Sequence, residues 1–107
     1  MSDFQDFLKH QYASVSVASF KPGKFAEVQK LYEKAVDTYK DGFKGAYLLQ
    51  EPGSDEGLSV IFWDSLEDME ANQTETHEQL LQQMAPYFES PPRMKTFELV
   101  CQIQPSD

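Results

Sequence analysis

The stretch FKGAYLLQEPGSDEGLSVIFW, residues 43–63, decides the fold of this chain. It holds two apolar runs, residues 43–50 and 58–63, with the segment PGSDEG between them. Proline, glycine, serine and aspartate at this density are typical of a solvated turn, since each of them favours a turn conformation. Two apolar runs of strand length around such a turn predict an antiparallel hairpin.

Apolar residues recur at helical spacing on both sides of the hairpin. Before it, steps of three and four residues predict an amphipathic helix of about four turns. Its apolar stripe comprises Phe25, Val28, Leu31, Tyr32, Ala35, Val36 and Tyr39. The glycine of Asp41-Gly42 suits the position just past the end of a helix. After the hairpin, Ser65 is expected to cap a helical region that runs to about residue 88, with an interruption near residues 72–76.

One alternating run lies outside each helix. Residues 12–20 and residues 94–103 alternate with period two, which favours strands. The resulting order, strand-helix-strand-strand-helix-strand, is the split βαβ pattern, and short right-handed connections leave few alternatives. We therefore predict an α+β, ferredoxin-like fold, with a four-stranded antiparallel sheet and both helices on one face. The 107 residues suit a single domain over residues 1–107, with residues 1–11 as an N-terminal extension.

The two faces of the predicted sheet differ in side-chain size. In the first strand, Ser14 and Ser16 lie on a small face, which leaves room for another group to lie against the sheet. We expect Trp63, Ile61 and Val100 on the face that the helices leave uncovered. A second copy of the chain, packed sheet on sheet, would cover that face, so we predict a homodimer.

Composition narrows the classes of partner. The formal net charge of −9 repels phosphate groups, so neither nucleic acid nor an anionic membrane is an expected partner. No stretch approaches the length of a membrane span, and the N-terminus lacks the pattern of a signal peptide, so we expect a cytoplasmic protein. The single cysteine, Cys101, excludes an intrachain disulfide and a cysteine-based zinc site, and its apolar neighbours predict a buried thiol.

Three stretches carry a family resemblance: FKPGKF at residues 20–25, GFKGAY at residues 42–47 and VIFWDSLED at residues 60–68. They are similar to motifs at strand ends and strand-to-helix junctions in the antibiotic biosynthesis monooxygenase-like group of dimeric α/β barrels. The resemblance spans about residues 12–103 and implies a homodimer with a cavity in each subunit, between the sheet and the helices. Members of the group include cofactor-free oxygenases, haem-degrading enzymes and signal-molecule-processing proteins, so the motifs indicate the fold more than the activity.

The resemblance also indicates candidate site residues. His77 matches the second histidine of a helix pattern common in the group, and Asn72 stands at the position of the first. Histidine titrates near neutral pH and can act as a base or a hydrogen-bond donor. We expect His77 and Asn72 to be catalytic, although a solvated helix end is the alternative role of His77. We expect the substrate-binding residues to be Ser14, Ser16, Tyr47 and Trp63. For Trp63 the alternative is a structural role, in which it packs at the junction of sheet and helix or in the dimer interface.

Metal and haem sites are not expected. The haem-degrading members carry a strand asparagine, a helix tryptophan and an iron-ligating histidine. These positions fall near Ser16, Asn72 and Gln82, and none of the three matches. The acidic residues of the segment DSLEDME suit the start of a helix, where negative charge is favoured. We therefore predict no cofactor and no metal.

The sequence favours a small-molecule-binding dimer, which the resemblance suggests is a cofactor-independent monooxygenase acting on an aromatic or quinol-like compound. Two alternatives stay open. One is a noncatalytic ligand-binding or stress-related module that shares only the fold. The other is a haem-binding protein in which His77 ligates the iron from another turn of the helix.

Overall fold

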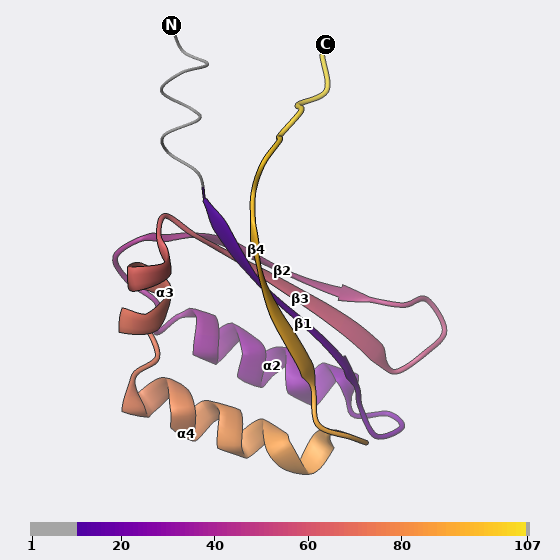
Figure 1. The fold of residues 1–107 in the computed structure, drawn as a ribbon. Coiled ribbons are helices and arrows are strands. Elements are labelled where there is room, and N and C mark those ends of the chain that lie inside the picture. Colours follow the sequence, from indigo (N-terminus) through magenta and orange to yellow (C-terminus); the bar gives the residue numbers. More distant parts are fainter. Residues whose placement is uncertain (1–10, 107) are drawn as a thin grey trace, which may run out of the picture.

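The computed structural model describes residues 11–106 of the chain (Figure 1). The elements in chain order are β1 (Tyr12–Ser19), α2 (Phe25–Val36), β2 (Phe43–Gln50), β3 (Glu56–Trp63), α3 (Leu66–Ala71), α4 (Glu75–Met84), the 3-10 helix η1 (Ala85–Tyr87) and β4 (Arg93–Glu98). This order is the predicted split βαβ pattern, and the ferredoxin-like α+β fold is confirmed. The predicted N-terminal extension, residues 1–11, lies outside the described residues except for Gln11.

The four strands form one antiparallel sheet in the order β2-β3-β1-β4. The central pair, β1 and β3, is in a register that sets Ser16 opposite Ser59 and Ser14 opposite Ile61. On the far side of β3, the pairing with β2 shifts at a bulge between Phe43 and Gly45. The register thus brings small residues of β1 and β3 together on one face, in the middle of the sheet.

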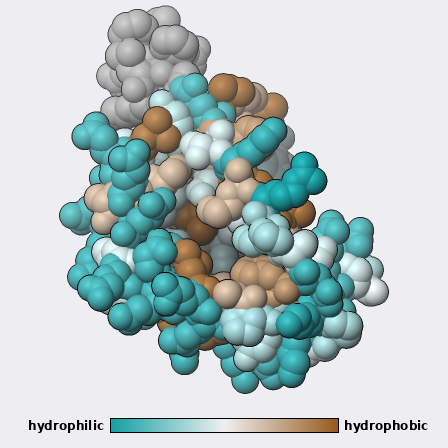
Figure 2. All heavy atoms as spheres, turned by 60° about the horizontal axis from the view of Figure 1, so that its bottom comes forward, coloured by the Kyte–Doolittle hydropathy of each residue, from teal (hydrophilic) through white to brown (hydrophobic). Residues whose placement is uncertain are grey.

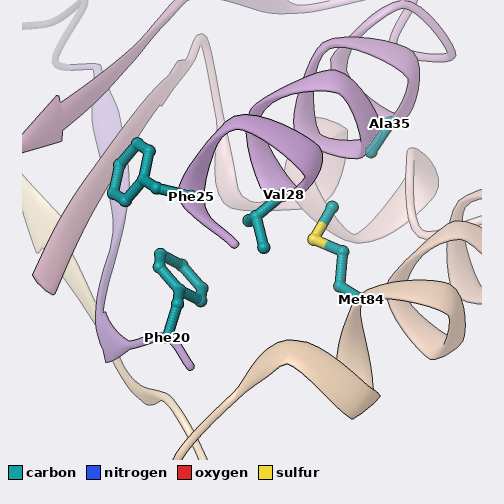
Figure 3. Close-up of a cluster of buried hydrophobic side chains, with 5 residues drawn as sticks. All are labelled: Phe20, Phe25, Val28, Ala35 and Met84. Carbon is teal, nitrogen blue, oxygen red and sulfur yellow. The ribbon is translucent and has the colours of Figure 1, made fainter. Parts of the chain in front are cut away.

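Both long helices lie on the same side of the sheet, and α3 lies near one of its ends (Figure 1). A cluster of buried side chains joins β1, α2 and α4 (Figure 3), and its members are Phe20, Phe25, Val28, Ala35 and Met84. The ring of Phe20 packs edge-on against that of Phe25, with centroids 5.3 Å apart. This contact joins the end of β1 to the start of α2, because Phe20 directly follows β1 and Phe25 is the first residue of α2.

The first helical region is shorter than predicted, and the second is interrupted as predicted. Helix α2 ends at Val36, so Tyr39 lies in the connection to β2 and not on the helix. The end is a tight turn, in which the Thr38 hydroxyl and amide both donate to the Ala35 carbonyl. The predicted interruption of the second helical region is confirmed, since α3 ends at Ala71 and α4 starts after Thr74.

The last strand is shorter than predicted. It ends at Glu98, the partner of Tyr12 at the start of β1, and the Leu99 amide then donates to the Gln11 carbonyl. The chain beyond forms no strand within the described residues, so Val100 is exposed. The expectation of a buried Cys101 thiol is wrong for the same reason, since the residue lies in this tail and is exposed.

The assignment of the sheet faces needs one correction. Trp63 and Ile61 point toward the helices, and the uncovered face carries Leu58, Val60 and Phe62 instead. A sheet face that packs against helices usually carries the bulkier side chains. In this sheet the small residues face the helices, so the space there is filled incompletely. Over residues 11–106, none of the helices has the length and apolar character needed to cross a bilayer.

Candidate functional site

A cavity of about 270 Å³ lies between the sheet and the helices. It exists because the helix-facing side of β1 and β3 carries Ser14, Ser16 and Ser59, which leave the helices without large partners there. In the space-filling view the helical side is hollowed, with hydrophobic side chains deep in the hollow and hydrophilic ones around it (Figure 2). A largely apolar hollow with a few polar groups is the usual form of a small-molecule site.

Residues of both the sheet and the helices line the cavity. The strands contribute its floor, the two long helices its sides, and the segment after α4 its far end. The lining residues are Ser14, Ser16, Ala18, Phe20, Val28, Tyr32, Ala35, Val36, Tyr39, Leu48, Gly57, Ser59, Ile61, Trp63, Met69, Gln73, His77, Leu81, Met84, Phe88, Pro92 and Met94.

A hydrogen-bonded pair, His77 and Tyr39, forms the main polar feature of this wall. The Tyr39 hydroxyl lies 2.8 Å from His77 Nε2, and the ring centroids are 5.1 Å apart. His77 is in the first turn of α4, where the Thr74 hydroxyl accepts from its backbone amide. Tyr39 reaches it from the connection between α2 and β2, so the pair joins two segments that are 38 residues apart in sequence.

Burial governs the ionisation of both residues. It lowers the pKa of His77 below its usual 6.5, and the nearby carboxylate of Glu78 opposes this only in part. It also raises the pKa of Tyr39 far above its usual 10, with a smaller contribution from Tyr32. Near neutral pH the pair is therefore a neutral imidazole beside a neutral phenol.

Two buried nitrogen atoms, one in this pair and one in the adjacent Trp63, have no hydrogen-bond partner within the described residues. They are His77 Nδ1 and Trp63 Nε1. An unpartnered buried polar group costs about 1–3 kcal/mol, and proteins leave few of them. Both residues line the cavity. The part of the wall around His77 and Trp63 therefore has polar groups that the described residues do not satisfy.

Trp63 lies beside the pair at the end of β3, and it is only 2% exposed. Its ring packs edge-on against Tyr39, with centroids 4.7 Å apart, and against Phe43 at 5.8 Å. The Gly42 carbonyl accepts from the Asp64 amide at 2.8 Å, which fixes the end of β3 next to the start of β2. The indole is thus both a packed residue and a part of the cavity wall.

A second polar group lies on the floor of the cavity. The Tyr32 hydroxyl, from α2, is 2.8 Å from the Ser59 hydroxyl and also donates to the Tyr47 carbonyl at 3.2 Å. Burial raises the pKa of Tyr32, and the hydrogen bond with Ser59 opposes that shift. Ser16 is the strand partner of Ser59, and both serines line the cavity.

The structure brings together four of the six residues that the sequence suggested. Ser14, Ser16, Trp63 and His77 all line the cavity. Tyr47 does not, because it points to the uncovered face of the sheet, where it is 61% exposed. The Tyr47 side chain, which we expected in the substrate-binding site, is therefore not part of the wall of this cavity. Its neighbour Leu48 faces the cavity instead, as the alternation of side chains along a strand requires.

Asn72 is also placed differently from the expectation. It is buried, but its amide is fully engaged with backbone groups. Its Oδ1 accepts from the Lys40 amide at 2.8 Å, and its Nδ2 donates to the carbonyls of Asp41 at 3.0 Å and Asp68 at 2.8 Å. Asn72 is not among the lining residues. Its contacts are those of a structural residue that ties the end of α3 to the connection before β2.

Tyr39 and Tyr32 are the site residues that sequence reasoning missed as polar groups. Their three- and four-residue spacing placed them in the apolar stripe of the helix. The residue type alone could have indicated their polar role, since a buried tyrosine usually has a hydrogen-bond partner for its hydroxyl. The sequence does not identify that partner, because His77 and Ser59 come from distant segments.

The donor set of the cavity does not fit haem. Imidazole binds haem iron through a free ring nitrogen. In this structure His77 Nε2 is hydrogen-bonded to Tyr39, and Nδ1 is buried. Between residues 11 and 106 there is also no group of three histidine, cysteine, aspartate or glutamate residues that could hold a metal ion.

Solved structures with this fold are similar to the chain along most of its length. SnoaB, a cofactor-independent oxygenase from Streptomyces nogalater, has a TM-score of 0.77 at 14% identity, over 90% of this chain and 98% of that one. A provisionally named antibiotic biosynthesis monooxygenase from Caulobacter crescentus has a TM-score of 0.76 at 15% identity, over 91% and 98%. A protein of unknown function from Nitrosomonas europaea has a TM-score of 0.71 at 19% identity, over 92% and 98%.

Neither a family model nor a curated protein matches the sequence. The structural likeness, at these identities, establishes the fold and not the activity. The resemblance to the monooxygenase-like group is thus confirmed at the level of the fold.

Proposed function

We propose that this protein binds an aromatic or quinol-like small molecule in the cavity and oxygenates it without a cofactor. The observation that carries the proposal is a largely apolar cavity of about 270 Å³ with a buried His77–Tyr39 pair in its wall. The volume is close to the lower end of the range for small-molecule sites. The aromatic residues of the wall, Trp63 and Phe88 among them, suit a flat apolar ligand.

The proposed chemistry uses the electrons of the substrate. A base removes the proton of an aromatic hydroxyl, and dioxygen adds to a ring carbon of the resulting anion. One oxygen atom stays on that ring carbon as a carbonyl. The other leaves as water, together with the hydrogen of the hydroxyl and the hydrogen of the ring carbon that was attacked. His77 is the candidate base, since it is neutral near pH 7 and lines the cavity. The apolar wall excludes water from the reactive intermediate.

A homodimer is part of the proposal. The face of the sheet that the helices leave open carries large apolar side chains that are half exposed or more, namely Tyr47, Leu49 and Phe97. Exposed apolar surface of this kind commonly marks a protein interface. The same face of a second copy is its natural complement, because a two-fold interface pairs identical surfaces.

Ligand binding is tested with the purified protein and 1-naphthol, followed by tryptophan fluorescence. We expect quenching of Trp63, the single tryptophan, and saturable binding. Ser16→Leu fills the floor of the cavity and should weaken binding about tenfold or more, since a blocked pocket loses the apolar contacts of the ligand. Ser90→Leu makes the same change in an exposed loop and serves as the matched control.

Turnover is tested separately, by oxygen uptake in the presence of a metal chelator and identification of the product by mass spectrometry. Incorporation of one atom of labelled dioxygen into 1-naphthol or a related phenol supports the oxygenase. Binding without any oxygen uptake across a panel of phenols and quinols would instead favour the noncatalytic binding module. If the wild-type protein and Ser16→Leu bind the probe equally, the cavity is not the site.

A further inference from the structure

The hydrogen bond between Tyr39 and His77 has a preferred direction. If the tyrosine donates to Nε2, both atoms are satisfied and only the Nδ1–H lacks a partner. If Nε2–H donates to the tyrosine, the tyrosine hydrogen and the Nδ1 lone pair both lack one within the described residues. The first arrangement leaves fewer buried polar groups unpaired, so it is the more stable. His77 is therefore the Nδ1–H tautomer, and Tyr39 is the donor.

This direction determines what Tyr39 offers to a ligand. Its single hydrogen is committed to His77, so its oxygen is left as an acceptor. Tyr39 lines the cavity together with His77. The raised pKa of Tyr39 also means that the phenol stays protonated and does not act as the base by itself. A ligand that meets this oxygen must therefore donate a hydrogen bond, which requires an O–H or N–H group.

We propose that Tyr39 is a catalytic residue that accepts the proton of a ligand hydroxyl while passing its own proton to His77 Nε2. The O–H bond of the ligand breaks, and its proton joins the Tyr39 oxygen. The former Tyr39 proton moves to Nε2, so the products are a ligand oxyanion, an unchanged tyrosine and an imidazolium. This inference rests on the proposed function and deepens it: the substrate is a phenol, recognised through its hydroxyl.

The surroundings of His77 suit a transient proton acceptor. Once protonated, the imidazolium carries an Nδ1–H that has no partner among the described residues, so the protein itself stabilises this cation weakly. The acidic group that acts on His77 is Glu78, the next residue on α4. The ligand oxyanion, which Tyr39 separates from His77, supplies the other negative charge. The charged state therefore forms together with the bound anion, and the proton can return later in the cycle.

The relay is tested with 4-nitrophenol, whose anion absorbs in the visible range, and with 4-nitroanisole, which has no hydroxyl group. All measurements are made at one pH, chosen slightly acid so that the free probe is mostly neutral. The variants are Tyr39→Phe and His77→Gln. Tyr87→Phe, which removes a tyrosine hydroxyl outside the cavity wall, is the matched control. Binding of 4-nitroanisole shows that a variant is folded with its cavity intact.

We expect wild-type protein and Tyr87→Phe to bind 4-nitrophenol with a clear anion band. Tyr39→Phe and His77→Gln should bind 4-nitroanisole as the wild type does, while the anion band falls about tenfold, the loss of one hydrogen bond to an ionised group. An undiminished band in Tyr39→Phe overturns the relay and leaves the binding function standing. If Tyr39→Phe fails to fold, an undiminished band in His77→Gln overturns the relay as well. Failure of the wild type to bind either probe overturns the proposed function itself.

Discussion

His77 and Tyr39 show how burial and one hydrogen bond set the chemistry of single residues. An exposed histidine would be partly protonated near neutral pH, and an exposed tyrosine would be an unremarkable donor and acceptor. In the wall of the cavity the imidazole is neutral, and in the tautomer that we infer the phenol directs its hydrogen at Nε2. The pair can therefore accept a proton from a ligand, but it has no hydrogen directed at the ligand to donate.

The lowered pKa of His77 predicts a dependence of stability on pH. The unfolded chain, with its ordinary pKa near 6.5, binds more protons than the folded chain at any pH between the two values. Stability therefore falls as the pH is lowered through 6.5 toward the pKa of the folded state, and the loss is complete below it. We expect urea midpoints of wild-type protein to fall more steeply between about pH 7.5 and 5.5 than those of His77→Gln. Parallel curves would contradict the assignment, because the carboxylates titrate mainly at lower pH in both proteins.

Asn72 is a residue whose contribution should be to stability. Replacement by alanine leaves the Lys40 amide and the Asp41 carbonyl without the side-chain partner, while the Asp68 carbonyl loses one bond and keeps that from the backbone amide of residue 72. We expect Asn72→Ala to lower the free energy of unfolding by about 2–4 kcal/mol, measured by urea denaturation, since several buried groups lose their hydrogen bonds. Glu70→Ala, at an exposed position of the same helix, should change it by less than about 0.5 kcal/mol. A loss of binding in Asn72→Ala with unchanged stability would return the residue to the site.

At the scale of elements, the break between α3 and α4 is what brings His77 to the cavity. One continuous helix would carry the residue in a different direction. The break is built from two caps: Asn72 follows the end of α3, and the Thr74 hydroxyl accepts from the His77 amide at 3.3 Å. A side-chain acceptor at this position satisfies one of the free amides of the first turn. The first turn of α4 is thereby fixed at the residue that faces Tyr39.

The cap of α4 can be tested directly. Thr74→Ala removes the acceptor for the His77 amide, and we expect a loss of about 1 kcal/mol in the free energy of unfolding. Thr76→Ala, two residues on and exposed, is the matched control and should be neutral or slightly stabilising, since alanine is the better helix former. Chemical denaturation of the two variants beside the wild type measures both effects. Equal stability of the two variants would show that the threonine cap contributes nothing.

At the scale of the whole molecule, the two faces of the sheet have different tasks. The helix-facing side carries small residues and lines the cavity, and the opposite side carries the bulk. Tyr47 and Phe62 pack edge-on there, with ring centroids 6.2 Å apart. The aromatic surface on the uncovered side therefore belongs to assembly in our proposal, while the binding of a small molecule belongs to the other side.

The proposed homodimer predicts the effect of a charge on the uncovered face. Leu49→Glu places a carboxylate on that surface, where burial against a second copy would cost several kcal/mol. We expect this variant to be a monomer by analytical ultracentrifugation at a concentration where the wild type is a dimer. Leu66→Glu, at an exposed leucine of α3 and outside the strands, should leave the dimer intact. A monomeric wild-type protein, or a dimeric Leu49→Glu, would contradict the interface.

The sequence by itself determined the order and most of the bounds of the elements, because these depend on local periodicity, turn residues and caps. The hairpin of residues 43–63 and the interruption after Ala71 are examples. It also indicated the unusual small face of β1. Only the tertiary structure decided which face of the sheet the helices cover, since alternation alone gives two faces and not their partners. That choice moved Trp63 into the cavity and Tyr47 out of it. The pairing of Tyr39 with His77 likewise required the fold, because their contact joins segments that local patterns do not connect.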